Sequence, residues 1–233
     1  MVTEIKLPKI TIKYIEGKPV NQLLLVGGGR QPSKDWLQKA VNGRTLWCID
    51  HGVDICHELG LVPERLLGDF DSCNSNSLQW AKDYGTIIEK YDAHKDFTDT
   101  QAALNKAQKD NCYTILTGAM GNRFDHTYST IFSFGNSLIN GCIADEQETI
   151  FFLRSKESIQ IALKANPKAI SLLPISPQVS GVNTSGLHWE LSNAQLIQAE
   201  PYAVSNVQAD EYHGDFTVSI GNGILAVYIC WQE

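Results

Sequence analysis

The stretch Arg-Leu-Leu-Gly-Asp-Phe-Asp-Ser, from Arg65 to Ser72, decides the fold because a short apolar run passes directly into two carboxylates. The same order recurs in the first half of the chain, where polar or glycine residues such as Asp50 follow short apolar runs. The runs lie at 23–26, 45–49, 65–67, 86–88 and 113–116. Short, continuous runs of this kind are typical of strands that a parallel sheet buries on both faces.

Amphipathic segments fill the intervals between these runs. Trp36, Leu37 and Ala40 recur at helical spacing, and Gly60 follows another such segment as a C-terminal cap. The expected helices cover 33–41, 53–59, 78–84, 98–109 and 125–138. The alternation predicts an α/β fold, a mainly parallel sheet with helices on both faces, in which ligands bind beyond the carboxyl ends of the strands.

Near residue 140 the pattern changes to strand-like segments separated by Gly, Pro, Ser and Asn. These segments lie at 149–153, 158–163, 169–173, 187–196, 215–220 and 224–231. A small antiparallel β domain is the simplest interpretation. We therefore expect an N-terminal extension over residues 1–22, an α/β domain over 23–140 and a β domain over 141–233.

The composition predicts a folded, acidic protein. With 233 residues and 43% hydrophobic content the chain can bury a sizeable core, and its formal charge of −7 argues against nucleic acid as a partner. Residues 1–22 lack the apolar stretch of a signal peptide, and no later segment has membrane-spanning length, which predicts a cytoplasmic protein with no membrane partner. The six scattered cysteines form no Cys-x-x-Cys pair and are expected to be reduced thiols.

Asp69 and Asp71 are the first candidate cation ligands. Because they are two residues apart, their carboxylates project to the same side if the extended conformation of the strand persists. Mg²⁺ prefers oxygen ligands and binds through one or two carboxylates together with substrate phosphates and waters. A polar turn that leaves the strand explains the same two residues equally well.

Asp96 and Asp99 begin an expected helix. Asp96 can cap this helix while Asp99 favours its first turn electrostatically, which explains both residues without a ligand. A first helical turn beyond a strand end also points toward the ligand crevice, and its free N–H groups favour phosphate. Beside Asp69 and Asp71, and with Asp50 at the same end of the sheet, we prefer the ligand interpretation.

Arg123 follows the fifth apolar run and can form a forked contact with phosphate. The alternative is a surface pair with Asp125. His126 is interpreted as a packing or hydrogen-bonding residue. The triple glycine at 27–29 lacks both the Walker lysine and the dinucleotide-binding spacing, so it indicates little on its own.

Three motifs follow one another along the chain: Leu-Leu-Gly-Asp-Phe-Asp-Ser at 66–72, Lys-Asp-Phe-Thr-Asp-Thr at 95–100 and Thr-Gly-Ala-Met-Gly-Asn-Arg-Phe-Asp-His at 117–126. Taken together they resemble the thiamine pyrophosphokinase family, and the combination is far more specific than any one part. The likeness continues into Thr-Ser-Gly-Leu-His-Trp-Glu-Leu at 184–191 and the pair at 205–206. It spans roughly residues 23 to 231.

This resemblance implies an N-terminal α/β catalytic domain, a C-terminal antiparallel β-sandwich domain and a homodimer whose active sites lie between subunits. It also implies the reaction of ATP with thiamine to give AMP and thiamine diphosphate, with Mg²⁺ as the metal and ATP as the co-substrate.

The resemblance assigns roles to the matching positions. The implied Mg²⁺ ligands are Asp69, Asp71 and Asp99, and the implied catalytic set adds Asp96 and Arg123. The implied ATP-binding residues are Asp50, Gly52, Thr98, Arg123 and Asp125. The implied thiamine pocket contains Trp189, Ser205 and Asn206, although an indole in an antiparallel sheet is otherwise expected in the core.

Two positions depart from the family pattern. His51 stands in a turn where the family commonly has glycine, and Asn122 replaces the second glycine of a Gly-Gly-Arg motif. Two other functions stay open. Asp69 resembles the nucleophile of haloacid-dehalogenase phosphatases, although that motif usually ends the first strand of its domain. A thiamine or nucleotide sensor without turnover is the other alternative.

Overall fold

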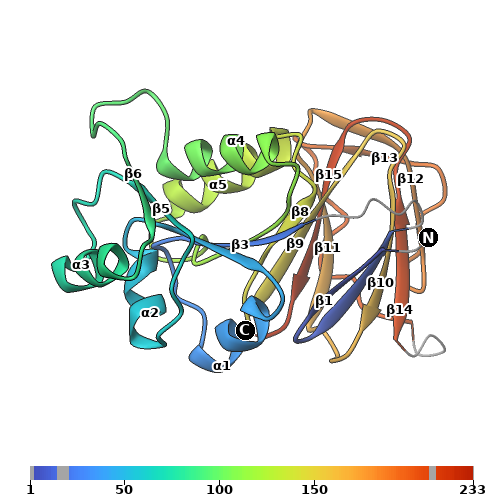
Figure 1. Cartoon of the computed structure of the whole chain (residues 1–233). Coiled ribbons are helices and arrows are strands. Elements are labelled where there is room, and N and C mark those ends of the chain that lie inside the picture. Colours follow the sequence, from blue (N-terminus) through green and yellow to red (C-terminus); the bar gives the residue numbers. More distant parts are fainter. Residues whose placement is uncertain (1–2, 15–20, 210–213, 233) are drawn as a thin grey trace. The chain divides into compact units, whose positions relative to one another are not determined.

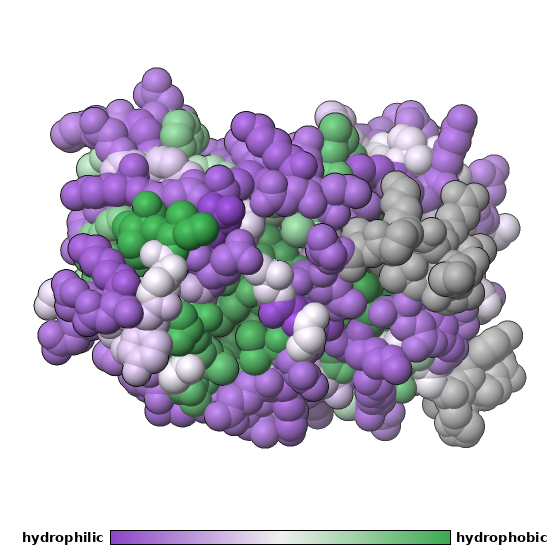
Figure 2. All heavy atoms as spheres, viewed as in Figure 1, coloured by the Kyte–Doolittle hydropathy of each residue, from purple (hydrophilic) through white to green (hydrophobic). Residues whose placement is uncertain are grey.

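The computed structural model describes residues 3–14, 21–209 and 214–232 (Figure 1). It divides into two compact units, one formed by Val20–Asp145 and the other by Met1–Pro19 together with Glu146–Glu233. The change of architecture predicted from the sequence, at residue 140, lies five residues before this division. Hydrophilic side chains cover most of the face drawn in Figure 2, with smaller apolar areas between them.

The unit Val20–Asp145 contains the expected parallel sheet. Its strands are β3 (Gln22–Val26), β4 (Thr45–Ile49), β5 (Arg65–Gly68), β6 (Ile87–Lys90), β7 (Tyr113–Thr117) and β8 (Gly141–Ala144). They lie in the order β8-β7-β3-β4-β5-β6, and every neighbouring pair is parallel. All residues of β7 are buried, as a sheet covered on both faces requires. The strand β8 was not predicted, because its four residues begin shortly after the end of α5 (Phe124–Asn136) and form too short a run to stand out.

Helices cover both faces of these strands, as expected. They are α1 (Lys34–Val41), α2 (Gly52–Glu58), α3 (Ser75–Asp83), α4 (Asp99–Lys109) and α5 (Phe124–Asn136). Figure 1 shows α4 and α5 on one side of the parallel strands and α1 and α2 on the other. Side chains cap three of them: the Ser33 hydroxyl accepts from the Trp36 amide, Asn74 caps α3, and Thr98 forms a capping box at α4. Among the described residues, no helix combines the length and apolarity that a membrane span needs.

The other unit is an antiparallel β-sandwich. One sheet has the order β1-β2-β10-β14-β12-β13, and the remaining strands of this unit pair in the order β11-β15-β9. The first sheet consists of β1 (Thr3–Leu7), β2 (Ile10–Tyr14), β10 (Ser158–Leu163), β14 (Asp215–Ser219), β12 (Gln178–Ser185) and β13 (Ala194–Ile197). The remaining strands are β9 (Glu148–Arg154), β11 (Ala169–Pro174) and β15 (Ile224–Cys230). The N-terminal residues, left without a role by the sequence analysis, thus supply two strands, and β2 pairs with β10.

One expected strand of this unit, at 187–196, is wrong. The chain is instead extended over β12, crosses an irregular segment at 186–193, and pairs again from Ala194. Val179, Val182 and Thr184 are the buried residues of β12. Their alternation is hidden in the sequence because Gly181 takes a φ of 68° and shifts the register between Val179 and Val182.

The order of the parallel strands predicts very different costs for two isoleucine truncations. Ile115 on β7 is fully buried between β3 and β8, whereas Ile87 on the edge strand β6 is 47% exposed. We expect Ile115→Ala to lower the free energy of unfolding by about 2–5 kcal/mol and Ile87→Ala by less than about 1 kcal/mol. Urea unfolding followed by tryptophan fluorescence measures both, and equal losses would contradict this order.

Candidate functional site

The carboxyl edge of the parallel strands encloses a cavity of about 690 Å³. Successive turns of the same unit line it, including the glycines after β3, Asp50 and His51 after β4, and Ser72 after β5. The start of α4, the turn after β7 and the first two turns of α5 complete the lining. The cavity therefore lies where an open parallel sheet is expected to bind its ligand.

Two glycine turns meet at one side of this cavity. The Gly27 amide donates to the Thr117 carbonyl at 2.8 Å, and the Gly29 amide donates to the Gly118 carbonyl at 2.6 Å. The turns are held further by Arg30, whose guanidinium bonds the buried Asp145 carboxylate with a 2.6 Å Nη2–Oδ2 distance. The triple glycine thus allows the turn after β3 to pack closely against the turn after β7. Because its role is in this packing, it need not follow the spacing of either glycine-rich phosphate motif.

Asp50 is fixed in the turn between β4 and α2. Its backbone takes a φ of 44°, which is uncommon for a residue other than glycine, and its amide donates to the Leu67 carbonyl at 3.0 Å. Its Oδ1 atom accepts a hydrogen bond from the Phe70 amide at 3.2 Å and lies close to Gly68, in the space that a side chain there would fill. A Cβ atom on Gly68 would lie 1.7 Å from that oxygen, so Gly68 makes room for the carboxylate.

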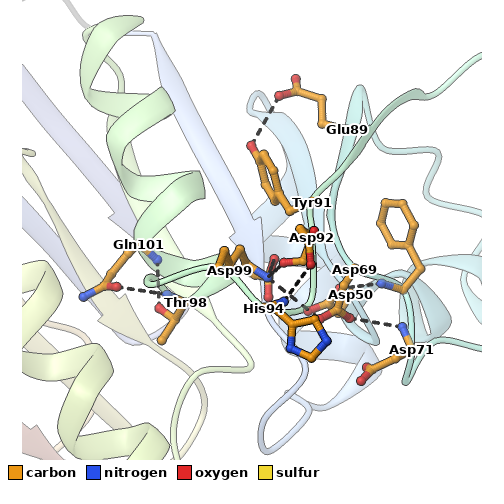
Figure 3. A network of polar contacts seen from close by, with 12 residues as sticks. Asp50, Asp69, Asp71, Glu89, Tyr91, Asp92, His94, Thr98, Asp99 and Gln101 are labelled. Atoms are coloured by element: carbon orange, nitrogen blue, oxygen red, sulfur yellow. Dashed lines mark hydrogen bonds and ion pairs between the residues drawn. The ribbon is translucent and has the colours of Figure 1, made fainter.

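Three carboxylates converge beside the cavity: Asp50, Asp69 and Asp99, which we call the acidic cluster (Figure 3). Burial is the largest cause that raises the pKa of Asp50, and together with the charges of Asp99 and Asp69 it brings this pKa to about 7. The Phe70 amide and the Lys95 ammonium act in the opposite direction. The structure therefore brings these acids close enough for mutual repulsion.

Lys95 is the cation of this cluster, and the sequence analysis did not single it out. Its ammonium nitrogen lies 3.1 Å from Asp99 Oδ1 and 3.8 Å from Asp69 Oδ2. The Lys95 side chain is only 9% exposed. A signal was present, because Lys95 opens the Lys-Asp-Phe-Thr-Asp-Thr motif four residues before Asp99, but lysine is commonly a solvated surface residue.

Asp71 and Asp96, two of the predicted acids, lie outside the cluster. The Asp71 side chain is exposed, and its amide donates to Asp69 Oδ1 at 3.2 Å. Asp96 is also exposed, and neither residue lines the cavity. In the ranges that the structure describes, no three His, Cys, Asp or Glu side chains are arranged to hold a metal ion by themselves.

The donor chemistry nevertheless fits Mg²⁺. All the acids at this edge offer oxygen atoms, and Mg²⁺ commonly uses one or two carboxylates and takes its remaining ligands from phosphates and waters. Asp99 Oδ1 is buried and accepts no hydrogen bond from the described residues, so only a charge, that of Lys95, compensates it. A full cage of protein ligands is not needed for such an ion.

The start of α4 and the turn after β7 present groups that suit an anion. Thr98 and Asp99 line the cavity at the N-terminus of an eleven-residue helix, where unpaired N–H groups favour phosphate. Arg123 and Asp125 also line it, paired by two hydrogen bonds of 3.1 and 2.5 Å. This pair is the surface alternative considered from the sequence, and the Arg123 hydrogen bond lowers the pKa of Asp125.

Trp189 lies on an irregular segment of the sandwich unit. Its side chain is 61% exposed, so the core position expected for an indole in a sheet is wrong. Asn206 holds the segment: its Oδ1 accepts from the Trp189 amide at 3.1 Å, and its Nδ2 donates to the Trp189 carbonyl at 2.8 Å. The neighbouring Ser205 takes a φ of 57°, and its amide donates to the Ser171 hydroxyl. The three residues predicted for one pocket are thus joined in one loop system.

Two family models match the chain, one over the segment that contains the acidic cluster and one over the segment that contains Trp189. The model of thiamin pyrophosphokinase, catalytic domain, matches residues 37–142, and that of thiamin pyrophosphokinase, vitamin B1 binding domain, matches residues 156–225. The chain belongs to the thiamine pyrophosphokinase family. The expected family and fold are confirmed.

Individual thiamine pyrophosphokinases are similar over much of their length. The Bacillus subtilis protein is 26% identical over 206 residues, which cover 86% of this chain and 94% of that relative. Thiamine pyrophosphokinase 1 of Oryza sativa is 24% identical, covering 64% of this chain and 60% of its own. The crystal structure of the B. subtilis protein has a TM-score of 0.79 at 21% identity, covering 91% of this chain and 100% of its own, and thus shares the fold.

Both departures from the thiamine pyrophosphokinase pattern leave the backbone intact. His51 has a φ of −55°, which any residue adopts, while the close contact belongs to Gly52, where a Cβ would lie 2.1 Å from the Val26 carbonyl oxygen. Asn122 has a φ of 58°, and asparagine is among the residues that tolerate this conformation best. The turns before α2 and α5 are therefore preserved.

The raised pKa of Asp50 makes stability depend on pH. In the unfolded chain this carboxyl ionises near its ordinary pKa of about 4, whereas in the fold it keeps its proton to about pH 7. Unfolding between these values releases a proton, so raising the pH lowers the free energy of unfolding. We expect Asp50 to contribute a loss of roughly 1–2 kcal/mol from pH 5 to pH 8, after allowance for solvent screening.

Urea unfolding of wild type and Asp50→Asn at both pH values, with EDTA present, measures this contribution. The variant should lose less stability than wild type on going to pH 8. Asp83→Asn, an exposed position on α3, is the matched control and should follow wild type. An Asp50→Asn variant with the wild-type pH dependence would show that this carboxyl is not destabilised in its ionised form.

Proposed function

We propose that the chain transfers the diphosphoryl group of ATP to the hydroxyl group of thiamine, giving thiamine diphosphate and AMP. The observation that carries this proposal is the acidic cluster beside a cavity of about 690 Å³, and the residues of this cluster lie within the segment that matches the catalytic-domain model. The Trp189 loop system lies within the segment that matches the vitamin B1 binding model.

ATP would occupy the cavity at the carboxyl edge of the parallel strands. A volume of about 690 Å³ falls in the range of small-molecule sites. Thr98 and the first amides of α4 would meet the phosphates, and Arg123 would exchange part of its pairing with Asp125 for a phosphate oxygen. Gly52 would keep the turn after Asp50 close to the nucleotide.

Asp69, Asp71 and Asp99 would hold Mg²⁺, with Asp50 and Asp96 beside them. When bound, the metal supplies charge neutralisation for the triphosphate and orients it. The exposed position of Asp71 leaves its carboxylate accessible to an ion that arrives with the nucleotide. This ligand set comes from the family resemblance, and its support here is the oxygen-only donor chemistry and the convergence of Asp69 with Asp99.

The transfer itself needs positioning more than covalent chemistry. The hydroxyl oxygen of thiamine attacks the β-phosphorus in line, and the bond from that phosphorus to the oxygen bridging the α- and β-phosphates breaks. AMP leaves with the bridging oxygen, and a carboxylate of the site accepts the hydroxyl proton. Arg123 and the α4 amides would stabilise the charge that develops on the phosphoryl oxygens.

Thiamine would bind on the sandwich unit at Trp189, Ser205 and Asn206. The exposed indole face of Trp189 suits a cationic thiazolium or a flat pyrimidine. Asn206 uses its side-chain amide to hold the Trp189 backbone, so it would position the indole. A homodimer with active sites between subunits is the part of the proposal that rests on the family resemblance alone, and the cytoplasmic location remains the prediction made from the sequence.

The two other functions considered from the sequence predict different products. A phosphatase with Asp69 as nucleophile would release phosphate through an aspartyl-phosphate, yet the Asp69 carboxylate accepts from the Asp71 amide and faces the Lys95 ammonium. A sensor would bind thiamine or nucleotide without turnover. The family membership favours the transferase over both.

Incubation of the purified chain with ATP, Mg²⁺ and thiamine should produce AMP and thiamine diphosphate in equal amounts. We expect Asp71→Asn and Asp99→Asn each to lower kcat by about a hundredfold or more, because a lost metal ligand removes several kcal/mol of charge stabilisation. Asp83→Asn is again the control and should keep wild-type turnover. Near-normal kcat in either site variant would reject its role as a ligand, and phosphate release without AMP would reject the transferase.

A further inference from the structure

The segment between β6 and α4 is folded around the side chain of Lys95. Asp92 organises the turn: its Oδ1 accepts from the His94 amide at 2.8 Å, and its carbonyl accepts from the Lys95 ammonium at 3.2 Å. The ammonium also lies 6.0 Å from the centre of the Tyr91 ring. The lysine is thus held at both its backbone and its charged end (Figure 3 shows Tyr91, Asp92 and His94 around the cluster).

Within the described part of the chain, the ammonium of Lys95 has three oxygen neighbours. Besides the Asp92 carbonyl these are Asp99 Oδ1 at 3.1 Å and Asp69 Oδ2 at 3.8 Å. An ammonium group has three N–H donors and no acceptor, so it suits a cluster of oxygens. With 9% of its side chain exposed, Lys95 is an internal cation and not a solvated surface charge.

Lys95 therefore already pairs with two of the carboxylates that would hold a metal ion and offsets part of their negative charge. A Mg²⁺ ion needs its oxygen ligands at about 2.0–2.1 Å and carries two positive charges. An ammonium at 3.1 Å from Asp99 Oδ1 would compete for that oxygen and repel the ion. In the observed arrangement, a metal ion would therefore compete with the ammonium for Asp99 Oδ1 and would be repelled by its charge.

We propose that Lys95 keeps the acidic cluster closed to free divalent cations until a nucleotide arrives. The incoming phosphates then take the ammonium away from Asp69 and Asp99 and leave these carboxylates to the metal. The inference rests on the proposed function, because it assumes that the metal ligands are those of the family. Metal binding then depends on the nucleotide, because its phosphates replace Asp69 and Asp99 as the partners of the ammonium.

The test measures cation affinity without any turnover. Mn²⁺ alone is titrated into the full-length chain, with free Mn²⁺ followed by electron paramagnetic resonance, for wild type, Lys95→Met and Lys90→Met. Lys90 is an exposed residue on β6, so its substitution removes the same charge outside the cluster. We expect Lys95→Met to bind Mn²⁺ at least about tenfold more tightly than wild type, and Lys90→Met to stay within about twofold of it.

Two further variants complete the test. Lys95→Met/Asp99→Asn should lose the gained affinity, which would place the bound ion at the cluster. Lys95→Gln, which keeps a polar group near Asp99, should also bind Mn²⁺ more tightly and replaces Lys95→Met if that protein does not fold. Turnover adds a second readout, because Lys95→Met should raise the KM for ATP by about tenfold when the phosphates lose the ammonium.

A Lys95 variant that binds Mn²⁺ no more tightly than Lys90→Met overturns the inference, and so does tighter binding that survives Asp99→Asn. The proposed function fails separately, if wild type forms no AMP from ATP and thiamine. A purely structural lysine would change the unfolding temperature without changing cation affinity beyond the Lys90→Met control.

Discussion

Repulsion between partly buried carboxylates is the constraint on which the candidate site depends. Asp50, Asp69 and Asp99 arrive from three separate turns, and burial together with their mutual charge raises the pKa of Asp50 to about 7. The Phe70 amide and the Lys95 ammonium offset part of this cost. Such a cluster is suited to binding a metal ion together with a polyphosphate, because the metal ion offsets the repulsion between the carboxylates and the phosphates complete its coordination.

The surrounding fold supplies the free energy that holds the acids in place. The buried strands β3, β4, β5 and β7 and their covering helices provide apolar burial, and the turns at their carboxyl ends carry the strain. Asp50 and Phe70 both take positive φ values, 44° and 66°, in the two turns that meet at the cluster. Such conformations persist where neighbouring structure fixes them, and they are concentrated at functional sites. The rigid sheet therefore makes the strained turns possible.

The sequence was sufficient to predict the parallel strands, because continuous apolar runs separated by helical periodicity have few other interpretations. It was also sufficient to predict which acids follow strand ends. It could not show which of them converge: Asp69 and Asp71 look equivalent in the sequence, yet only Asp69 faces the Lys95 ammonium. The strand β12 was missed because a glycine shift interrupts its alternation, and β8 because it is very short.

Lys95 shows a second limit of sequence reasoning. A lysine next to an aspartate in a polar segment is most often solvated, and only the fold of the turn around Asp92 reveals that its ammonium is enclosed. Trp189 shows the reverse case, since its strand-like surroundings indicate a core residue and the loop held by Asn206 exposes it. In both cases a tertiary contact several residues away decides the environment of the side chain.

The most direct test of the central claim, that this edge of the sheet performs diphosphoryl transfer, follows the oxygen that bridges the α- and β-phosphates. ATP labelled with ¹⁸O at that bridge is incubated with the chain, Mg²⁺ and thiamine, and the products are read by ³¹P nuclear magnetic resonance. Attack at the β-phosphorus predicts that all the bridge label appears in AMP, together with an equal amount of thiamine diphosphate. Label retained in the diphosphate product, or ADP and phosphate formed in place of AMP, would contradict the account.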